Sequence, residues 1–283
     1  MSSAVDLDTP PADTRSTADE PRRSGDVLRT LVRGLGQTLI TVGLISLLFV
    51  VYELYVTDIL AAREQDQLSQ QIQDQWRDDP TVAPAPTAPA PAAAAPPEQP
   101  FTPAPISVGV GDPFAVLHIP RLATDYSRVV VEGAAQDQLA QGPGHYLGTA
   151  MPGEQGNLAI AGHRVGRGSP FLDLDRMRPG DPIVVETADA WFVYRVLGDA
   201  STGRFDGDPS GIPGQEIVRP EAVSVISPTP GGPADGPASG AYLTLTTCHP
   251  KYSAQQRLII HARLDGAPFS KATTPDGPPA LAG

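Results

Sequence analysis

The sequence is poor in cysteine, in basic residues and in long hydrophobic runs. Its 283 residues include a single cysteine, Cys248, which excludes an intrachain disulfide framework and any zinc or iron–sulfur site built from several cysteines. Only 20 lysines and arginines stand against 32 acidic residues, and the net charge of −12 argues against a general nucleic-acid-binding protein. We therefore predict no nucleic-acid partner. A lone thiol is either an inert core residue or a reactive group, so Cys248 is the first candidate for chemistry.

One stretch is long and apolar enough to cross a membrane. Residues 34–52 carry no charge, and a helix of that length rises about 28 Å, enough for the hydrocarbon core of a bilayer. The alternatives are a buried helix of a soluble domain and a cleaved signal peptide, but no small-residue cleavage site follows Val51. We predict an uncleaved transmembrane anchor over residues 34–52.

The charges that flank this anchor predict its orientation. Four arginines precede it, at positions 22, 23, 29 and 33, whereas Arg63 is the only basic residue in the fifteen that follow. The positive-inside rule then predicts a single-pass cell-membrane protein. Residues 1–33 would form a disordered cytoplasmic tail, and the rest of the chain would be extracellular.

Proline and glycine are abundant instead, with 32 and 28 residues. Residues 80–105 alone hold ten prolines and nine alanines, so we predict a Pro/Ala-rich linker over residues 80–110 that extends at about 3.1 Å per residue. Before it, Leu68, Ile72 and Trp76 repeat with the spacing of one helix face. We predict a juxtamembrane stalk over residues 53–79, formed by a short solvated helix, with a partner surface as the alternative.

Short β-rich runs separated by Gly, Pro, Asp and Ser clusters extend from about residue 106 to residue 266. Many short strands with few helices are typical of an all-β closed barrel or sandwich, and about 160 residues suffice for one core. Residues 267–283 are expected to form a disordered tail. The expected strands are Phe114–Ile119, Arg128–Glu132, Asn157–Ala161, Ile183–Glu186, Trp191–Leu197, Tyr242–Thr247 and Arg257–Leu264, with short helical turns at Gln136–Gln141 and Phe171–Met177.

Three side chains form a candidate catalytic set. Cys248 follows a strand that Pro250 ends, so its thiol lies at the strand's mouth. A nucleophilic thiol needs a proton donor or acceptor and a group that stabilises an oxyanion. His163 ends the apolar run LAIAG, and Arg257 opens the next strand after the cysteine, where a hairpin can bring it beside the thiol. His249 is disfavoured because successive strand residues point to opposite faces. The alternatives are an inert core cysteine, a loop histidine and a surface arginine.

These residues resemble the motifs of the sortase family. TLTTC at 244–248 is similar to the family's Thr-Leu-x-Thr-Cys signature, AIAGH at 159–163 is similar to the strand that ends in its histidine, and the chain order His, Cys, Arg matches. An Arg-Pro-Gly-Asp turn at 178–181 also fits. HIPRL at 118–122 and YELYVTD at 52–58 are most similar to class E, the housekeeping type of high-GC Gram-positive bacteria.

The resemblance implies a sortase catalytic domain over residues 111–266, with a closed eight-stranded β-barrel and short helices behind one transmembrane helix. Cys248 would be the nucleophile, His163 the general acid and then the general base, and Arg257 the stabiliser of the oxyanion. Thr246 and Thr247 would line the substrate site. No carboxylate obviously orients His163, so we hypothesise that the thiolate–imidazolium pair is a minority form. We predict no cofactor, and no required metal because no acidic cluster has calcium-loop spacing.

The resemblance also implies partners. The substrates would be surface proteins with a sorting signal of the LAxTG or LPxTG type, cleaved between Thr and Gly, and the acceptor would be an amine of peptidoglycan or of its lipid-linked precursor. A pilus-polymerising sortase and a non-catalytic stalked adhesin or scaffold remain open alternatives. An L,D-transpeptidase would need a Ser-His-Gly-Cys setting, and papain-like proteases place cysteine before histidine.

Overall fold

The computed structural model describes residues 24–52, 57–78 and 101–282, and the chain divides into two compact units, Met1–Val51 and Tyr52–Gly283. In the first unit, helix α1 runs over Ser24–Val51, and its stretch Val27–Val51 is long and apolar enough to cross a membrane. The helix therefore begins inside the predicted tail of residues 1–33. Residues 1–23 of that tail lie outside the described part.

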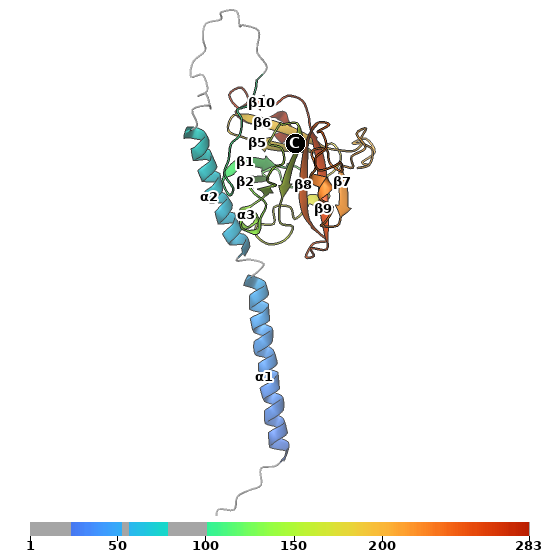
Figure 1. Ribbon diagram of the computed structural model, residues 1–283. Coiled ribbons are helices and arrows are strands. Elements are labelled where there is room, and N and C mark those ends of the chain that lie inside the picture. The colour runs from blue at the N-terminus through green and yellow to red at the C-terminus, as the bar shows by residue number, and fades with distance from the viewer. Residues whose placement is uncertain (1–23, 53–56, 79–100, 283) are drawn as a thin grey trace, which may run out of the picture. The chain divides into compact units, whose positions relative to one another are not determined.

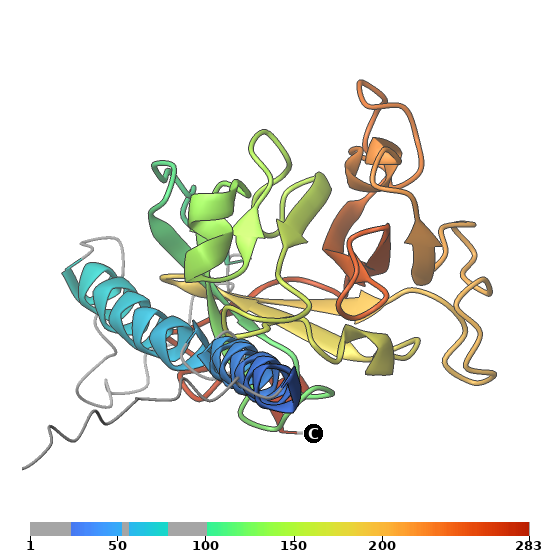
Figure 2. The ribbon, with the colours of Figure 1, turned by 90° about the horizontal axis from the view of Figure 1, so that it is seen from below.

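Eight strands of the second unit close into a barrel, as predicted (Figure 1). Going round the barrel, each strand pairs with the next in the order β1-β2-β3-β4-β8-β9-β6-β5, and β5 pairs with β1 again. The pairs β2–β3 and β4–β8 are parallel and the others antiparallel. Figure 2 shows the strands curling round one interior. The strands are β1 (Pro113–His118), β2 (Ser127–Glu132), β3 (Gly144–His145), β4 (Gly156–Ala161), β5 (Pro182–Glu186), β6 (Ala190–Val196), β8 (Ala241–His249) and β9 (Gln256–Leu264).

The interior is filled by apolar side chains that alternate along the strands. Leu243 and Leu245 of β8 and Leu258 and Ile260 of β9 are fully buried in the main core. All seven strands predicted from the β-rich runs are present within two residues of the expected bounds. The two predicted helical turns correspond to α3 (Gln136–Gln141) and to the 3₁₀ turn η2 (Leu174–Arg176).

Several short elements were not predicted. They are the two-residue strand β3, the edge strands β7 (Gln215–Val218) on β9 and β10 (Phe269–Ser270) on β6, and the 3₁₀ turns η3 (Val223–Ile226) and η4 (Pro279–Leu281).

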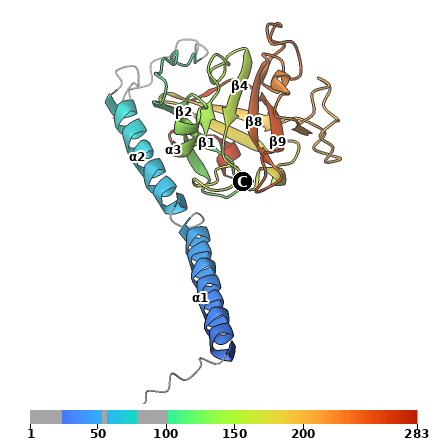
Figure 3. The same ribbon diagram turned by 60° about the horizontal axis from the view of Figure 1, so that its bottom comes forward.

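The predicted stalk is a helix, α2 (Thr57–Asp78), but one of its faces is packed on the barrel while the other residues stay largely exposed. Its Leu68 and Ile72 pack on Val116 of β1 and on Val129 and Val131 of β2, and Ile72 is completely buried. The stripe seen in the sequence therefore faces the outer surface of the barrel, and Figure 3 shows α2 lying beside β1 and β2. The partner surface considered for this helix is the protein's own barrel. Residues 53–56 and 79 lie outside the described part.

Both segments that flank the predicted catalytic domain also pack on the barrel. Phe101, Ile106 and Val108 of the predicted linker contact the main core, whereas residues 80–100 lie outside the described part. Over residues 267–282 the expectation of a disordered tail is wrong. The indole Nε1 of Trp191 donates to the Thr274 carbonyl at 3.0 Å, and Leu281 packs on the Trp191 cluster. These anchors outweigh the tail's high content of Pro and Gly.

Candidate active site

Three neighbouring strands, β4, β8 and β9, bring the predicted catalytic residues to one end of the barrel (Figure 3). Ala161, the last residue of β4, lies opposite Thr246 of the parallel strand β8, and the Gly162 amide donates to the Thr246 carbonyl at 3.1 Å. The β4–β8 pairing ends there, and His163 follows Ala161 by two residues, on the β4 side of β8. On the other side of β8, Cys248 is directly paired with Arg257 of β9. Adjacent strands lie about 4.8 Å apart, so Cys248 and Arg257 are direct neighbours.

Cys248 occupies the position that the sequence suggested, near the end of β8. It is a free, half-buried cysteine, and a cis peptide bond between His249 and Pro250 follows it. Since Leu243 and Leu245 face the barrel interior, the alternation places Cys248 on the opposite, outer face. The thiol is therefore not an apolar core group.

His163 is held by its backbone rather than by its imidazole Nε2. The amide of Phe171 donates to the His163 carbonyl at 3.1 Å. Within the described residues, the buried Nε2 of His163 has no hydrogen-bond partner. Burial lowers the pKa of His163, and the positive charge of Arg167 lowers that pKa further. The imidazole is therefore mostly neutral at neutral pH, in keeping with a minority imidazolium.

The residue before His163 has to be small. A β-carbon on Gly162 would lie 2.5 Å from a ring carbon of Phe171, which is completely buried. Gly162 thus lets Phe171 pack directly under the backbone that leads to the imidazole. Neither residue was predicted to support the site, although the position of Gly162 next to His163 was a usable signal.

Thr246 and Thr247 are both buried and have different roles. The Thr247 hydroxyl donates to the Gly162 carbonyl at 2.8 Å, which ties the cysteine strand to the residue before His163. The Thr246 hydroxyl lies 3.0 Å from the hydroxyl of Tyr146. Tyr146 was not predicted, because a lone tyrosine in a Gly- and Pro-rich loop gives no signal. Thr247 is thus engaged with the backbone, and Thr246 with Tyr146 on the outer face that carries Cys248.

Arg257 is anchored through one of its nitrogens. Its Nη1 donates to the carbonyls of Ala254 and Gln256 at 2.9 and 3.0 Å. In the described part of the chain, its Nε and Nη2 make no hydrogen bond to protein. The guanidinium is therefore held at the turn between β8 and β9 with donors to spare for an oxyanion.

Three of the other four histidines lie beside a glutamate, whereas His249, next to Cys248, resembles His163 in having a buried ring nitrogen without a hydrogen-bond partner among the described residues. His118, His145 and His261 lie within hydrogen-bond distance of Glu186, Glu132 and Glu216 respectively. Only His163 of the five follows β4 beside the cysteine. The described ranges contain no group of three or more His, Cys, Asp or Glu residues that could hold a metal ion.

Comparison with known proteins agrees with this geometry. The sortase domain profile matches residues 117–265. Sortase SrtE1 of Streptomyces coelicolor is 34% identical over 240 residues, which cover 82% of this chain and 56% of that protein. Sortase SrtE2 of the same organism is 30% identical over 253 residues, covering 86% of this chain and 85% of the relative. This chain thus spans little more than half the length of SrtE1.

A solved structure shares the fold. The SrtF sortase of Corynebacterium diphtheriae superposes with a TM-score of 0.58 and 37% sequence identity, over 66% of this chain and all of that one. The two Streptomyces relatives also confirm the predicted likeness to class E. With a matching family profile over more than half of its length and the residues of the family's motif on three adjacent strands, the chain belongs to the sortase family.

Proposed function

We propose that this protein is a membrane-anchored cysteine transpeptidase that joins surface proteins to the cell wall. The observation that carries the proposal is the strand pairing around β8: Cys248 is paired with Arg257 of β9, and β4, which is paired with β8 up to Ala161–Thr246, leads within two residues to His163. Membership of the sortase family supports the same reaction type.

The first half of the reaction forms a thioester. The Cys248 thiolate attacks the carbonyl carbon of threonine in the sorting signal, and Arg257 stabilises the oxyanion of the tetrahedral intermediate. The bond between Thr and Gly then breaks. His163, as imidazolium, gives its proton to the leaving glycine amine, and the threonine carbonyl stays on the sulfur.

The second half transfers the acyl group. An incoming amine attacks the thioester carbonyl, neutral His163 takes a proton from that amine, and the Cys248 thiolate leaves. The lowered pKa of His163 suits this base step, since most of the imidazole is already neutral. The acid step, in which the glycine amine leaves, instead requires the minority imidazolium form. Acylation therefore needs protonated His163, whereas transfer to the amine needs neutral His163.

The substrate and the location are part of the proposal. Likeness to two sortases E supports an LAxTG-type sorting signal, with LPxTG as the close variant, and an amine of peptidoglycan or of its lipid-linked precursor as acceptor. Thr246, on the outer face of β8 that carries Cys248, is the threonine proposed to lie nearest the bound sorting signal, whereas Thr247 supports the backbone before His163. Helix α1 with arginines before it supports a single-pass anchor whose N-terminus is cytoplasmic and whose catalytic domain is extracellular.

A transpeptidation assay tests this function. The full chain in detergent micelles is incubated with LAxTG or LPxTG peptides and an amine acceptor, and products are separated by chromatography. We expect the amide product with the wild type, none with Cys248→Ala, and a loss of about 10²–10³-fold in kcat for Arg257→Gln, the range seen when one oxyanion donor is removed. His163→Ala removes the proposed proton donor and acceptor. His249→Ala is its matched control, because it removes the other histidine near Cys248. A fully active Cys248→Ala protein contradicts the proposal, and a wild type inactive on every peptide favours a stalked adhesin.

A further inference from the structure

The loop that follows His163 has an unusual backbone. Gly166, Arg167, Gly168 and Ser169 all have positive φ values, from 41° to 74°. For Arg167 and Ser169 this conformation costs free energy, so surrounding contacts have to maintain it. The loop starts at the imidazole and ends at Phe171, whose amide bonds the His163 carbonyl. Any movement of this loop is therefore transmitted to His163.

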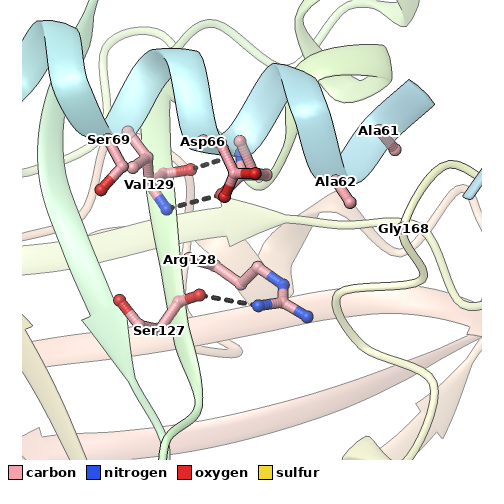
Figure 4. Close-up of a pocket in the computed structure, with 9 residues that line it drawn as sticks. Ala61, Ala62, Asp66, Ser69, Ser127, Arg128, Val129 and Gly168 are labelled. Atoms are coloured by element: carbon pink, nitrogen blue, oxygen red, sulfur yellow. Dashed lines mark hydrogen bonds between the residues drawn. The ribbon is translucent and has the colours of Figure 1, made fainter. Parts of the chain in front are cut away.

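One end of α2 contacts this loop. A β-carbon on Gly168 would lie 3.2 Å from the Cβ of Ala61, which is 6% exposed. Ala61, Ala62 and Gly168 line a cavity of about 410 Å³ together with residues of α2 and β2. Figure 4 shows the two alanines at the end of the helix, next to the loop that carries Gly168.

The helix itself is fixed on the barrel, so this contact has a defined position. The amide of Val129 donates to Gln65 Oε1 at 2.9 Å, and Gln65 Nε2 donates to the Gln141 carbonyl at 2.7 Å. The Gln65 side chain thereby hydrogen-bonds one backbone group of β2 and one at the end of α3. Leu68 and Ile72 pack on β1 and β2 further along, and Lys271 Nζ lies 4.1 Å above the ring of Trp76.

We propose that α2 is a positioning element for catalysis, and that Ala61 is the residue through which it holds the His163 loop. The helix that the sequence presents as a stalk then belongs to the catalytic domain, and it lies outside the region matched by the sortase domain profile. This inference rests on the proposed function for its kinetic consequences. The structural contact can be tested without activity.

The test uses full-length variants at adjacent positions of α2. Ala61→Leu forces a larger side chain against Gly168, whereas Ala62→Leu adds the same group at a position that lines the same cavity but is exposed. We expect Ala61→Leu to lower kcat for transpeptidation about 10-fold with little change in the KM for the peptide, since small misplacements of catalytic groups cost rate. Ala62→Leu should keep wild-type kinetics.

Two further measurements separate positioning from general loss of structure. A displaced loop hydrates His163, which raises its pKa, so the limb of the pH–rate profile governed by His163 should move to higher pH in Ala61→Leu but not in Ala62→Leu. Arg167 is the charged group that acts on this imidazole, and it stays in both variants. Hydrogen exchange followed by mass spectrometry should show faster exchange of residues 163–171 in Ala61→Leu. Gln65→Ala, which loosens the helix without adding bulk, should do the same.

The outcomes are decisive. If Ala61→Leu and Gln65→Ala match Ala62→Leu in kcat, in pH profile and in exchange of residues 163–171, α2 does not position the loop. If the wild type gives no product while exchange still rises in Ala61→Leu and Gln65→Ala, the contact stands and the proposed function fails.

Discussion

Lys251 Nζ lies 2.9 Å from Asp173 Oδ1, and this ion pair joins the loop after Cys248 to the segment after His163. The hydrogen bond from Lys251 is the main reason why the pKa of Asp173 lies below its usual value. Arg164, which follows His163, is buried and donates from Nε to the Leu172 carbonyl at 2.7 Å, so the segment around Asp173 is tied to the histidine as well. The segments that follow Cys248 and His163, the proposed catalytic residues, are thus connected outside the sheet too.

We expect Lys251→Met to lower kcat about 10-fold, because the loop after Cys248 and the segment after His163 lose a direct link. The melting temperature should change little, since partly exposed ion pairs contribute at most about 1 kcal/mol. Exchanging the charges, with Lys251→Asp and Asp173→Lys together, should restore much of the rate. Arg77→Met is the control, because Arg77 pairs with Asp74 of the same helix and joins no loops. Equal rates for Lys251→Met and Arg77→Met would show that the pair has no role in positioning.

Thr247→Val should reduce both stability and activity. The variant keeps the shape of the side chain but leaves the buried carbonyl of Gly162 without its donor, which costs about 1–3 kcal/mol of unfolding free energy. Urea denaturation measures this loss, and peptide transpeptidation measures the effect on the neighbouring His163. Thr247→Ser retains the hydroxyl and should stay near the wild type. Valine and serine variants of equal stability would refute the structural role of this bond.

Arg167→Gln should alter the pH dependence of the reaction. The positive charge of Arg167 lowers the pKa of His163, so its removal raises that pKa and moves the limb of the pH–rate profile governed by His163 to higher pH. The shift should shrink at high ionic strength, because salt screens the interaction. Arg178→Gln serves as the control, since Arg178 is a surface residue that does not contribute to the shift at His163. An unmoved limb in Arg167→Gln would mean that its charge does not reach the imidazole.

The sequence predicted local structure well where the pattern itself is local. The alternation of Leu243 and Leu245 with threonines located β8, and Pro250 located its end. The closed barrel came from the family resemblance, since no pattern in the chain specifies that β6 pairs with β9. The two-residue strand β3 is too short to show any alternation. Its place in the barrel depends on its pairing with β2 and with β4.

The errors concern what covers the barrel. The stripe of Leu68, Ile72 and Trp76 indicated a helix with one apolar face, but periodicity does not reveal what that face meets. The C-terminal segment was misjudged from its Pro and Gly content, although Lys271 bonds Glu186 at 2.7 Å and Thr274 accepts from Trp191. At the site, motif and position predicted Cys248, His163 and Arg257, and the structure pairs Cys248 with Arg257. The contacts of Tyr146 with Thr246 and of Ala61 with the loop at Gly168 were not predicted, because they join residues far apart in the chain.

Trapping the acyl-enzyme tests the central proposal most directly. The full chain is mixed with an excess of LAxTG peptide without an acceptor amine, quenched in acid and measured by intact-protein mass spectrometry with peptide mapping. We predict a mass increase equal to the peptide through its threonine, located on Cys248, released by added amine and absent in Cys248→Ala. An adduct on another residue, or the same adduct in Cys248→Ala, would contradict the assignment of Cys248 as the nucleophile.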